Sequence, residues 1–158
     1  MALLTAEALL GASALKVRTV AVPEWGGEVI IGEMSGTDRD DWDLAYFARE
    51  DAEKAAAARE KRPVNKHAAA ELHAARKVAW TARKPDGSDL FLVRRPNGRV
   101  DHVATEAVVA RLGAKSAAVL TRLARVSDDL SAIGTGALDA AEGNSGGTPS
   151  DSPDGKQP

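Results

Sequence analysis

Hydrophobic and polar positions along the chain first mark two short extended segments, residues 20–22 and 29–31, where aliphatic side chains recur at every second position. Trp25, Gly26 and Gly27 stand between them, and the two glycines supply the positive φ angles that a tight reversal requires. The pattern predicts a β-hairpin with Trp25 at its tip. Because an indole buries a large area and keeps one N–H donor, Trp25 is expected either to cover the local apolar face or to anchor a partner.

Alanine-rich segments on both sides of this hairpin predict helices. Thr5 caps a short helix that Gly11 ends. Thr37 and the acidic residues after it open a longer helix, which runs through residue 62 to the stop at Pro63. Within this longer helix the aromatic residues at 42 and 46 are one turn apart and are expected to pack on the hairpin.

The middle of the chain is less regular. A second helix is expected from about Asn65 to Arg76, and residues 77–83 are compatible with either a strand or an extension of that helix. Strong turn signals at residues 85–88 and 96–98 separate short β-prone runs, including residues 90–93.

Toward the C-terminus one apolar stripe gives the best periodic signal. It predicts a short helix over residues 105–112 and a longer one over residues 115–133 that glycines at 134–136 end. A core face is the expected role, and an oligomer seam is the alternative. The stripe comprises Leu112, Val119, Leu123, Val126, Leu130 and Ile133.

Together these elements predict an α+β fold: a small antiparallel β-hairpin sheet packed on three to four α-helices. Residues 1–136 are expected to form one domain, and residues 137–158, rich in glycine, serine and proline, to be a disordered tail.

The composition of the chain limits the classes of function that it can have. The 158 residues include 44% hydrophobic side chains, many of them alanine, and only 4% aromatic ones, so one thin core is expected. The net charge of −2 with mixed signs argues against nucleic acid as a partner, and the absence of cysteine excludes disulfides and thiol chemistry. No segment has the features of a secretory signal or a membrane span, which predicts a soluble, cytoplasmic protein.

No catalytic or metal-binding constellation emerges from the residues. His67, His73 and His102 lack the spacing of a metal site. The acidic cluster at residues 38–43 fits a helix N-terminus better than a calcium loop, and the basic run at 54–66 is typical of a solvated helical face. We therefore expect no enzymatic activity, no cofactor and no metal.

Four stretches, in order along the chain, together resemble one known family. They read LLTAE at 3–7; VPEWGGEV at 22–29 with MSGTDR at 34–39; DGSDLF at 86–91 with LGAKS at 112–116; and GNSGGTP at 143–149. They are similar to the tail assembly chaperones of bacteriophages with long, non-contractile tails. A polar insertion at residues 94–102 and the polar residues 150–158 depart from the family pattern.

The resemblance implies a non-enzymatic assembly factor that acts in the host cell cytoplasm and is not retained in the mature virion. Its implied partner is the tape measure protein, which it keeps soluble while tail tube protein is recruited. Self-association and a longer, frameshifted form are also implied, this chain being the short form. The alternatives are a structural tail component, such as a tube or terminator protein, and a regulatory adaptor.

Two surfaces are the expected partner contacts. One is the hairpin tip, and the other is the exposed side of the helix over residues 115–133. The candidate partner-binding residues are Trp25, Gly26, Gly27, Trp42, Leu123 and Leu130.

Overall fold

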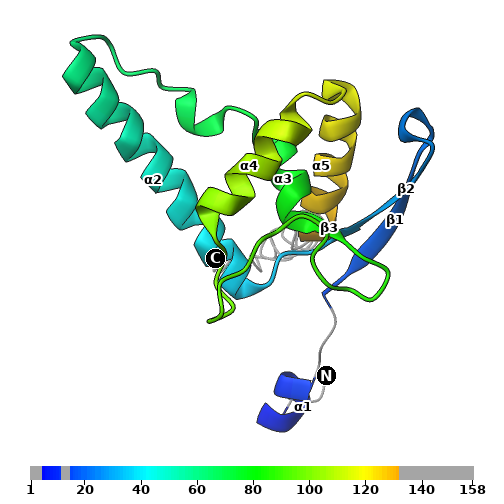
Figure 1. Ribbon diagram of the computed structural model, residues 1–158. Helices are drawn as coiled ribbons and strands as arrows, with labels where there is room; N and C mark the ends of the chain where they lie inside the picture. The colour runs from blue at the N-terminus through cyan, green and yellow to red at the C-terminus, as the bar shows by residue number, and fades with distance from the viewer. Residues whose placement is uncertain (1–4, 12–14, 132–158) are drawn as a thin grey trace, which may run out of the picture.

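The computed structural model describes residues 5–11 and 15–131, which form an α+β fold with a small antiparallel sheet beside a group of helices (Figure 1). The predicted fold class is therefore confirmed. The predicted disordered tail at residues 137–158 and the end of the predicted domain at 132–136 lie outside the described residues. In chain order the elements are α1 (Ala6–Gly11), β1 (Val17–Val22), the 3-10 turn η1 (Pro23–Trp25), β2 (Gly27–Gly32), α2 (Gly36–Glu60), the 3-10 turn η2 (Ala68–Ala70), α3 (His73–Thr81), β3 (Ala82–Arg83), α4 (His102–Gly113) and α5 (Ala117–Ser131).

The predicted hairpin is present as β1 and β2. The strands pair antiparallel from Val17 opposite Gly32 to Val22 opposite Gly27, and β3 joins the other side of β2. At the tip, the backbone N–H of Gly26 donates to the carbonyl of Pro23 at 3.0 Å. Gly26 has φ +74°, whereas Gly27 has no positive φ, so one glycine alone makes the reversal.

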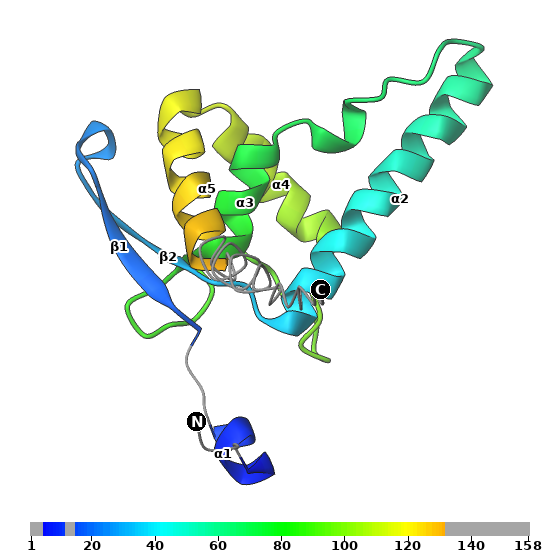
Figure 2. The same cartoon turned by 180° about the vertical axis from the view of Figure 1, so that it is seen from behind.

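Helix α3 lies at the centre of the core, where it packs against α4, α5 and β2 (Figure 2). Its Trp80 is 1% exposed and meets the ring of Trp42 edge to face, with centroids 5.4 Å apart. Trp42 also meets His73 edge to face at 5.6 Å. The ring of Trp42 therefore packs on α3, in a core cluster that also holds Val22 and Ile31 of the two hairpin strands.

The apolar stripe of the C-terminal helices faces the core, as expected. Leu123 is fully buried, and Leu112, Val119 and Leu130 are buried as well. The predicted end of the stripe at residue 133 and the glycines at 134–136 lie outside the described residues.

Helix boundaries differ from the sequence expectation at several points. Helix α2 ends at Glu60 rather than at residue 62, α4 begins at His102 rather than at residue 105, and α5 begins at Ala117 rather than at residue 115. Ser35, not Thr37, caps α2, and its hydroxyl accepts a hydrogen bond from the Asp38 N–H at 3.1 Å. Helix α3 starts at His73 rather than near Asn65 and continues to Thr81. The alternative that residues 77–83 extend a helix is thus confirmed as far as residue 81.

The connection over residues 84–101 is a loop, and the β-prone run at 90–93 is not a strand. Both predicted turns are present, since Gly87 and Gly98 have φ angles of +85° and +81°. Two isolated bridges lie here: Asp89 of the loop pairs with Arg83 of β3, and Arg94 pairs with Val100 within the loop itself.

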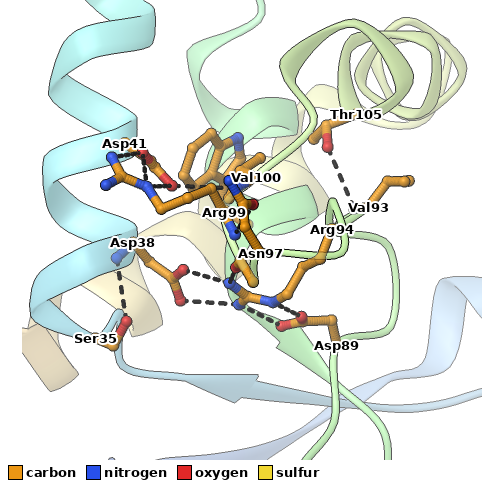
Figure 3. Close-up of polar contacts among 12 residues, drawn as sticks. Ser35, Asp38, Asp41, Asp89, Val93, Arg94, Asn97, Arg99, Val100 and Thr105 are labelled. Atoms are coloured by element: carbon orange, nitrogen blue, oxygen red, sulfur yellow. Dashed lines mark hydrogen bonds and ion pairs between the residues drawn. The ribbon is translucent and has the colours of Figure 1, made fainter.

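Two buried carboxylates on the first turns of α2 hold this loop in place (Figure 3). Asp38 accepts from Arg94 at 2.8 and 3.1 Å. Asp41 is paired with the guanidinium of Arg99 and accepts from the backbone N–H of Val100 at 3.1 Å. The acidic residues at the N-terminus of α2 therefore also hold in position a loop that lies more than 50 residues later in the chain.

Candidate functional site

A partly open, mainly apolar groove of about 840 Å³ lies between the hairpin tip, the loop before α4 and the C-terminal end of α4. We call it the Trp25 groove. Its lining residues are Trp25, Leu90, Phe91, Val108, Arg111, Leu112, Ala114 and Lys115. Its size is within the range of about 300–1,000 Å³ that is typical of ligand sites in proteins.

Trp25 lies at the groove because hydrogen bonds join the hairpin tip to α5. The carboxylate of Glu24 accepts two hydrogen bonds from Arg122, at 3.0 and 2.9 Å, and Arg122 also donates to the carbonyl of Ala21 at 3.5 Å. The hydrogen bonds from Arg122 lower the pKa of Glu24. Trp25 stays 38% exposed, so its indole forms one wall of the groove and is not part of the core.

Leu90 and Phe91 reach the groove because Asp89, directly before them, is clamped. Its carboxylate accepts from Arg83 at 3.0 Å and from Arg94 at 2.5 Å. The backbone N–H of Leu90 donates to the carbonyl of Ala82 at 3.0 Å. Burial lowers the pKa of Arg83, whose guanidinium faces this carboxylate. Leu90 remains 40% exposed, so the clamped loop presents an apolar side chain to solvent.

The remaining wall comes from α4 and the turn after it. Val108 and Leu112 are one turn apart on α4, and Leu112 belongs to both the core and the groove. Arg111 and Lys115 are exposed, and they are the charged side chains that line the groove. The groove therefore combines aromatic and aliphatic walls with a basic rim, which favours an apolar segment that carries acidic residues.

The predicted site residues divide into two groups. Trp25 lines the groove and Gly26 makes the turn that presents it, while Gly27 opens β2 and does not line the groove. Three other candidates are corrected: Trp42, Leu123 and Leu130 are 6%, 0% and 7% exposed and pack in the core. Because their side chains are covered by this chain itself, a partner cannot reach them without opening the core.

Most of the groove was not foreseen from the sequence. Leu90 and Phe91 were expected in a strand, and the signal that could have singled them out is their position between two turns, where apolar side chains are unusual. The sequence around Val108 and Leu112 gave a weaker indication of a surface groove. They form an i, i+4 pair beside the buried Val109, which widens the apolar face of α4 beyond one core stripe.

Several polar residues of the acidic cluster and the basic run have structural partners, among them Asp38, Asp41 and Arg62. Within residues 5–11 and 15–131 no group of three or more His, Asp or Glu side chains could hold a metal ion. His73 packs on Trp42, and burial lowers its pKa. None of the described helices combines the length and apolarity needed to cross a membrane.

Comparison with known families, curated proteins and solved structures finds no match to this chain. The assignment of a role therefore depends on the groove and on the sequence motifs.

Proposed function

We propose that this chain is a phage tail assembly chaperone that binds the tape measure protein through the Trp25 groove. It keeps that protein soluble and helps to recruit tail tube subunits, without catalysis and without a cofactor. In this proposal it acts in the host cell cytoplasm and is absent from the finished virion.

The observation that carries the proposal is the convergence of the resemblance motifs on the groove. The 22–29 stretch contributes Trp25, the 86–91 stretch contributes Leu90 and Phe91, and the 112–116 stretch contributes Leu112, Ala114 and Lys115. Six of the eight lining residues thus come from three stretches that lie far apart in the sequence. Nothing in the motifs themselves requires them to meet, so their meeting at an exposed apolar surface supports a shared binding role.

The chemistry of the groove suits an amphipathic helix. An α-helix with its side chains is about 10–12 Å across, so a groove of this size takes the apolar face of one to two turns. Arg111 and Lys115 then meet acidic residues beside that face. A tape measure protein is long and helical according to the family resemblance, and it would offer many such faces.

Weak binding at each site is compatible with this role. When many copies coat one long chain, the apolar faces are covered collectively, and each copy can be displaced when tube subunits arrive. A partly open groove with two aromatic walls fits such a displaceable contact.

The alternative role is a structural tail component. A tube protein is expected to be dominated by β-strands, whereas the described part of this chain is mainly helical with short strands. Mass spectrometry of purified virions separates the two roles: the chaperone role predicts that this chain is missing from mature particles, and its abundant recovery there would contradict the proposal.

Co-expression with the tape measure protein of the same phage tests the proposal directly. We expect the wild-type chain to raise the soluble fraction of the tape measure protein, and Trp25→Ala and Phe91→Ala to lose this effect. Val103→Ala is the matched control, because Val103 is 81% exposed and does not line the groove. The proposal fails if the tape measure protein is no more soluble with the wild-type chain than without it.

A further inference from the structure

Strand β1 is an outer strand of the sheet, and one of its edges has no neighbouring strand among the described residues. In an antiparallel ladder, residues that exchange hydrogen bonds with the neighbouring strand alternate with residues whose N–H and C=O point away from it. The backbone N–H of Glu33 donates to the carbonyl of Lys16 at 2.8 Å, which places residues 16, 18, 20 and 22 in the bonded set. The backbone groups of Val17, Thr19 and Ala21 therefore face the open edge.

Contacts on both sides of the hairpin agree with this alternation. Ile30, which lies opposite Thr19, pairs with β3 on the far side of β2. The carbonyl of Ala21 accepts from Arg122 of α5 at 3.5 Å, so it points away from β2. Among the described residues, nothing bonds the backbone groups of Val17 or Thr19 on this edge. The edge thus offers donors and acceptors in the pattern that an added strand satisfies.

The edge lacks most of the features by which proteins block strand addition. The six residues of β1 include no proline, and their pairing with β2 is continuous, without a bulge. Val17 is 57% exposed. An open hollow of about 680 Å³ on α5, which Arg122 helps to line, leaves room beside the Ala21 end of the edge. The one blocking feature is the charge of Arg18, which repels basic segments and attracts acidic ones.

The charges nearest to the edge are basic. Lys16 and Arg18 are exposed, and a spacing of two places them on the same face of the strand. The carboxylates of the hairpin, Glu24, Glu28 and Glu33, stand at the tip or on the β2 side of the ladder. An added strand lies about 4.8 Å from β1 and about twice as far from β2, so it meets the two basic side chains first.

We propose that the free edge of β1 binds an extended, acidic segment of another protein, which adds to the sheet as an antiparallel fourth strand. Main-chain hydrogen bonds to Val17, Thr19 and Ala21 hold the segment, and acidic side chains at every second position meet Lys16 and Arg18. The orientation follows the existing sheet, whose strands all pair antiparallel. A second copy of this chain is disfavoured, because β1 strands paired about Thr19 make the Arg18 side chains of the two copies diagonal neighbours.

A fluorescein-labelled peptide of alternating threonine and glutamate, about eight residues long to span the edge, is the probe. With the full chain we expect a saturable rise in fluorescence anisotropy, and the affinity should fall as the salt concentration rises. A threonine–lysine peptide of the same length is the control for charge and should bind at least about tenfold more weakly. No saturable binding of the acidic peptide, or equal binding of both peptides, overturns the proposal. This inference does not depend on the Trp25 groove or on the proposed function.

Backbone methylation of the probe tests strand addition itself. When the glutamates lie opposite Lys16 and Arg18, the threonines lie opposite the edge-facing residues, so the threonine N–H groups point to β1 and the glutamate N–H groups point to solvent. N-methylation of the threonines should abolish binding, whereas N-methylation of the glutamates should change the dissociation constant by less than about threefold. Equal effects of the two methylation patterns contradict an antiparallel strand on this edge.

Two variants of the chain locate the site. Thr19→Pro removes one edge N–H and leaves the bonds between β1 and β2 in place, and we expect the acidic peptide to bind about fivefold or more weakly. Thr19→Ala keeps that N–H and is the matched control. Arg18→Glu should also weaken binding by about fivefold, whereas Arg59→Glu, at an exposed arginine on α2, should not. Circular dichroism confirms that each variant is folded. Unchanged binding in Thr19→Pro or in Arg18→Glu contradicts the proposed site.

Discussion

The carboxylate of Asp41, on the second turn of α2, accepts a hydrogen bond from the backbone N–H of Val100, 3.1 Å away and 59 residues later in the chain. The same carboxylate pairs with the guanidinium of Arg99. Asp41 is 3% exposed, so these contacts are made away from bulk water. They close the loop over residues 84–101 against α2, and this loop carries Leu90 and Phe91 of the groove.

Loss of this carboxylate is expected to destabilise the fold. Asp41→Ala leaves a buried backbone N–H and a guanidinium without their acceptor, and it should lower the free energy of unfolding by about 2–4 kcal/mol. Urea denaturation followed by circular dichroism measures the change. Asp43→Ala is the control: the Asp43 pair with Arg39 is exposed, and its loss should cost less than about 1 kcal/mol. Equal effects of the two substitutions would contradict this role of Asp41.

Asp41 should also make the stability of the fold sensitive to acid. The hydrogen bond from Arg99 lowers the pKa of Asp41 below its ordinary value, so the folded chain keeps the carboxylate ionised where the unfolded chain already binds a proton. Its stabilising contribution is complete above the unfolded pKa, about 3.9, and is lost as the pH falls through the lower folded value. Unfolding free energies measured between neutral pH and pH about 3 should therefore fall less steeply in Asp41→Asn than in the wild-type chain. Parallel curves of unfolding free energy against pH for the two proteins would show that Asp41 does not contribute to the acid sensitivity.

The two glycines of the hairpin should respond differently to substitution. Gly26→Ala places a side chain at φ +74° and is expected to cost about 1 kcal/mol, because alanine is strained in that region. Gly27→Ala meets no atom within 4 Å and has no positive φ, so its effect on thermal stability should be small. If the order of the two effects is reversed, the turn geometry described here is wrong.

Ser127 is a site where a smaller, apolar side chain should be tolerated. Its side chain is 1% exposed, and its hydroxyl has no hydrogen-bond partner among the described residues. Ser127→Ala is therefore expected to stabilise the chain by about 1 kcal/mol or to be neutral.

Thr105 provides the contrast to Ser127. It is equally buried, but its hydroxyl accepts from the Val93 N–H at 3.3 Å, so Thr105→Val should destabilise by about 1–2 kcal/mol. Chemical denaturation of both variants makes the comparison, and a clear loss of stability in Ser127→Ala would contradict it.

Local signals made the hairpin, α2 and the C-terminal stripe predictable. Glycine at the turn, a helix-capping segment before Trp42 and a sustained period near 3.6 residues each act within a few residues of one another. The start of α3 was predicted wrongly because contacts between distant parts of the chain determine it. The alanines at 68–70 favour a helix, yet Arg49 of α2 donates to the carbonyl of Ala69 at 3.2 Å and Leu72 adopts φ +55°, so tertiary contacts override propensity.

The groove depends on contacts that no local pattern reveals. Leu90 and Phe91 have β-propensity, but Asp89 is clamped by two arginines, and this holds the segment as a loop. The apolar stripe correctly indicated a core face, while the choice of Leu123 and Leu130 as contact residues mistook its buried side for an accessible one.

Titration of a soluble, tryptophan-free helical segment of the tape measure protein into this chain, followed by tryptophan fluorescence, tests the central claim most directly. Trp42 and Trp80 are buried, so a blue shift on binding reports Trp25, which is 38% exposed. The proposal predicts a saturable blue shift. It also predicts that Trp25→Ala weakens binding, measured by calorimetry, by about thirtyfold, because a tryptophan at the centre of an interface contributes roughly 2 kcal/mol or more. No spectral change, or an unaltered affinity in Trp25→Ala, would contradict a binding role for the Trp25 groove.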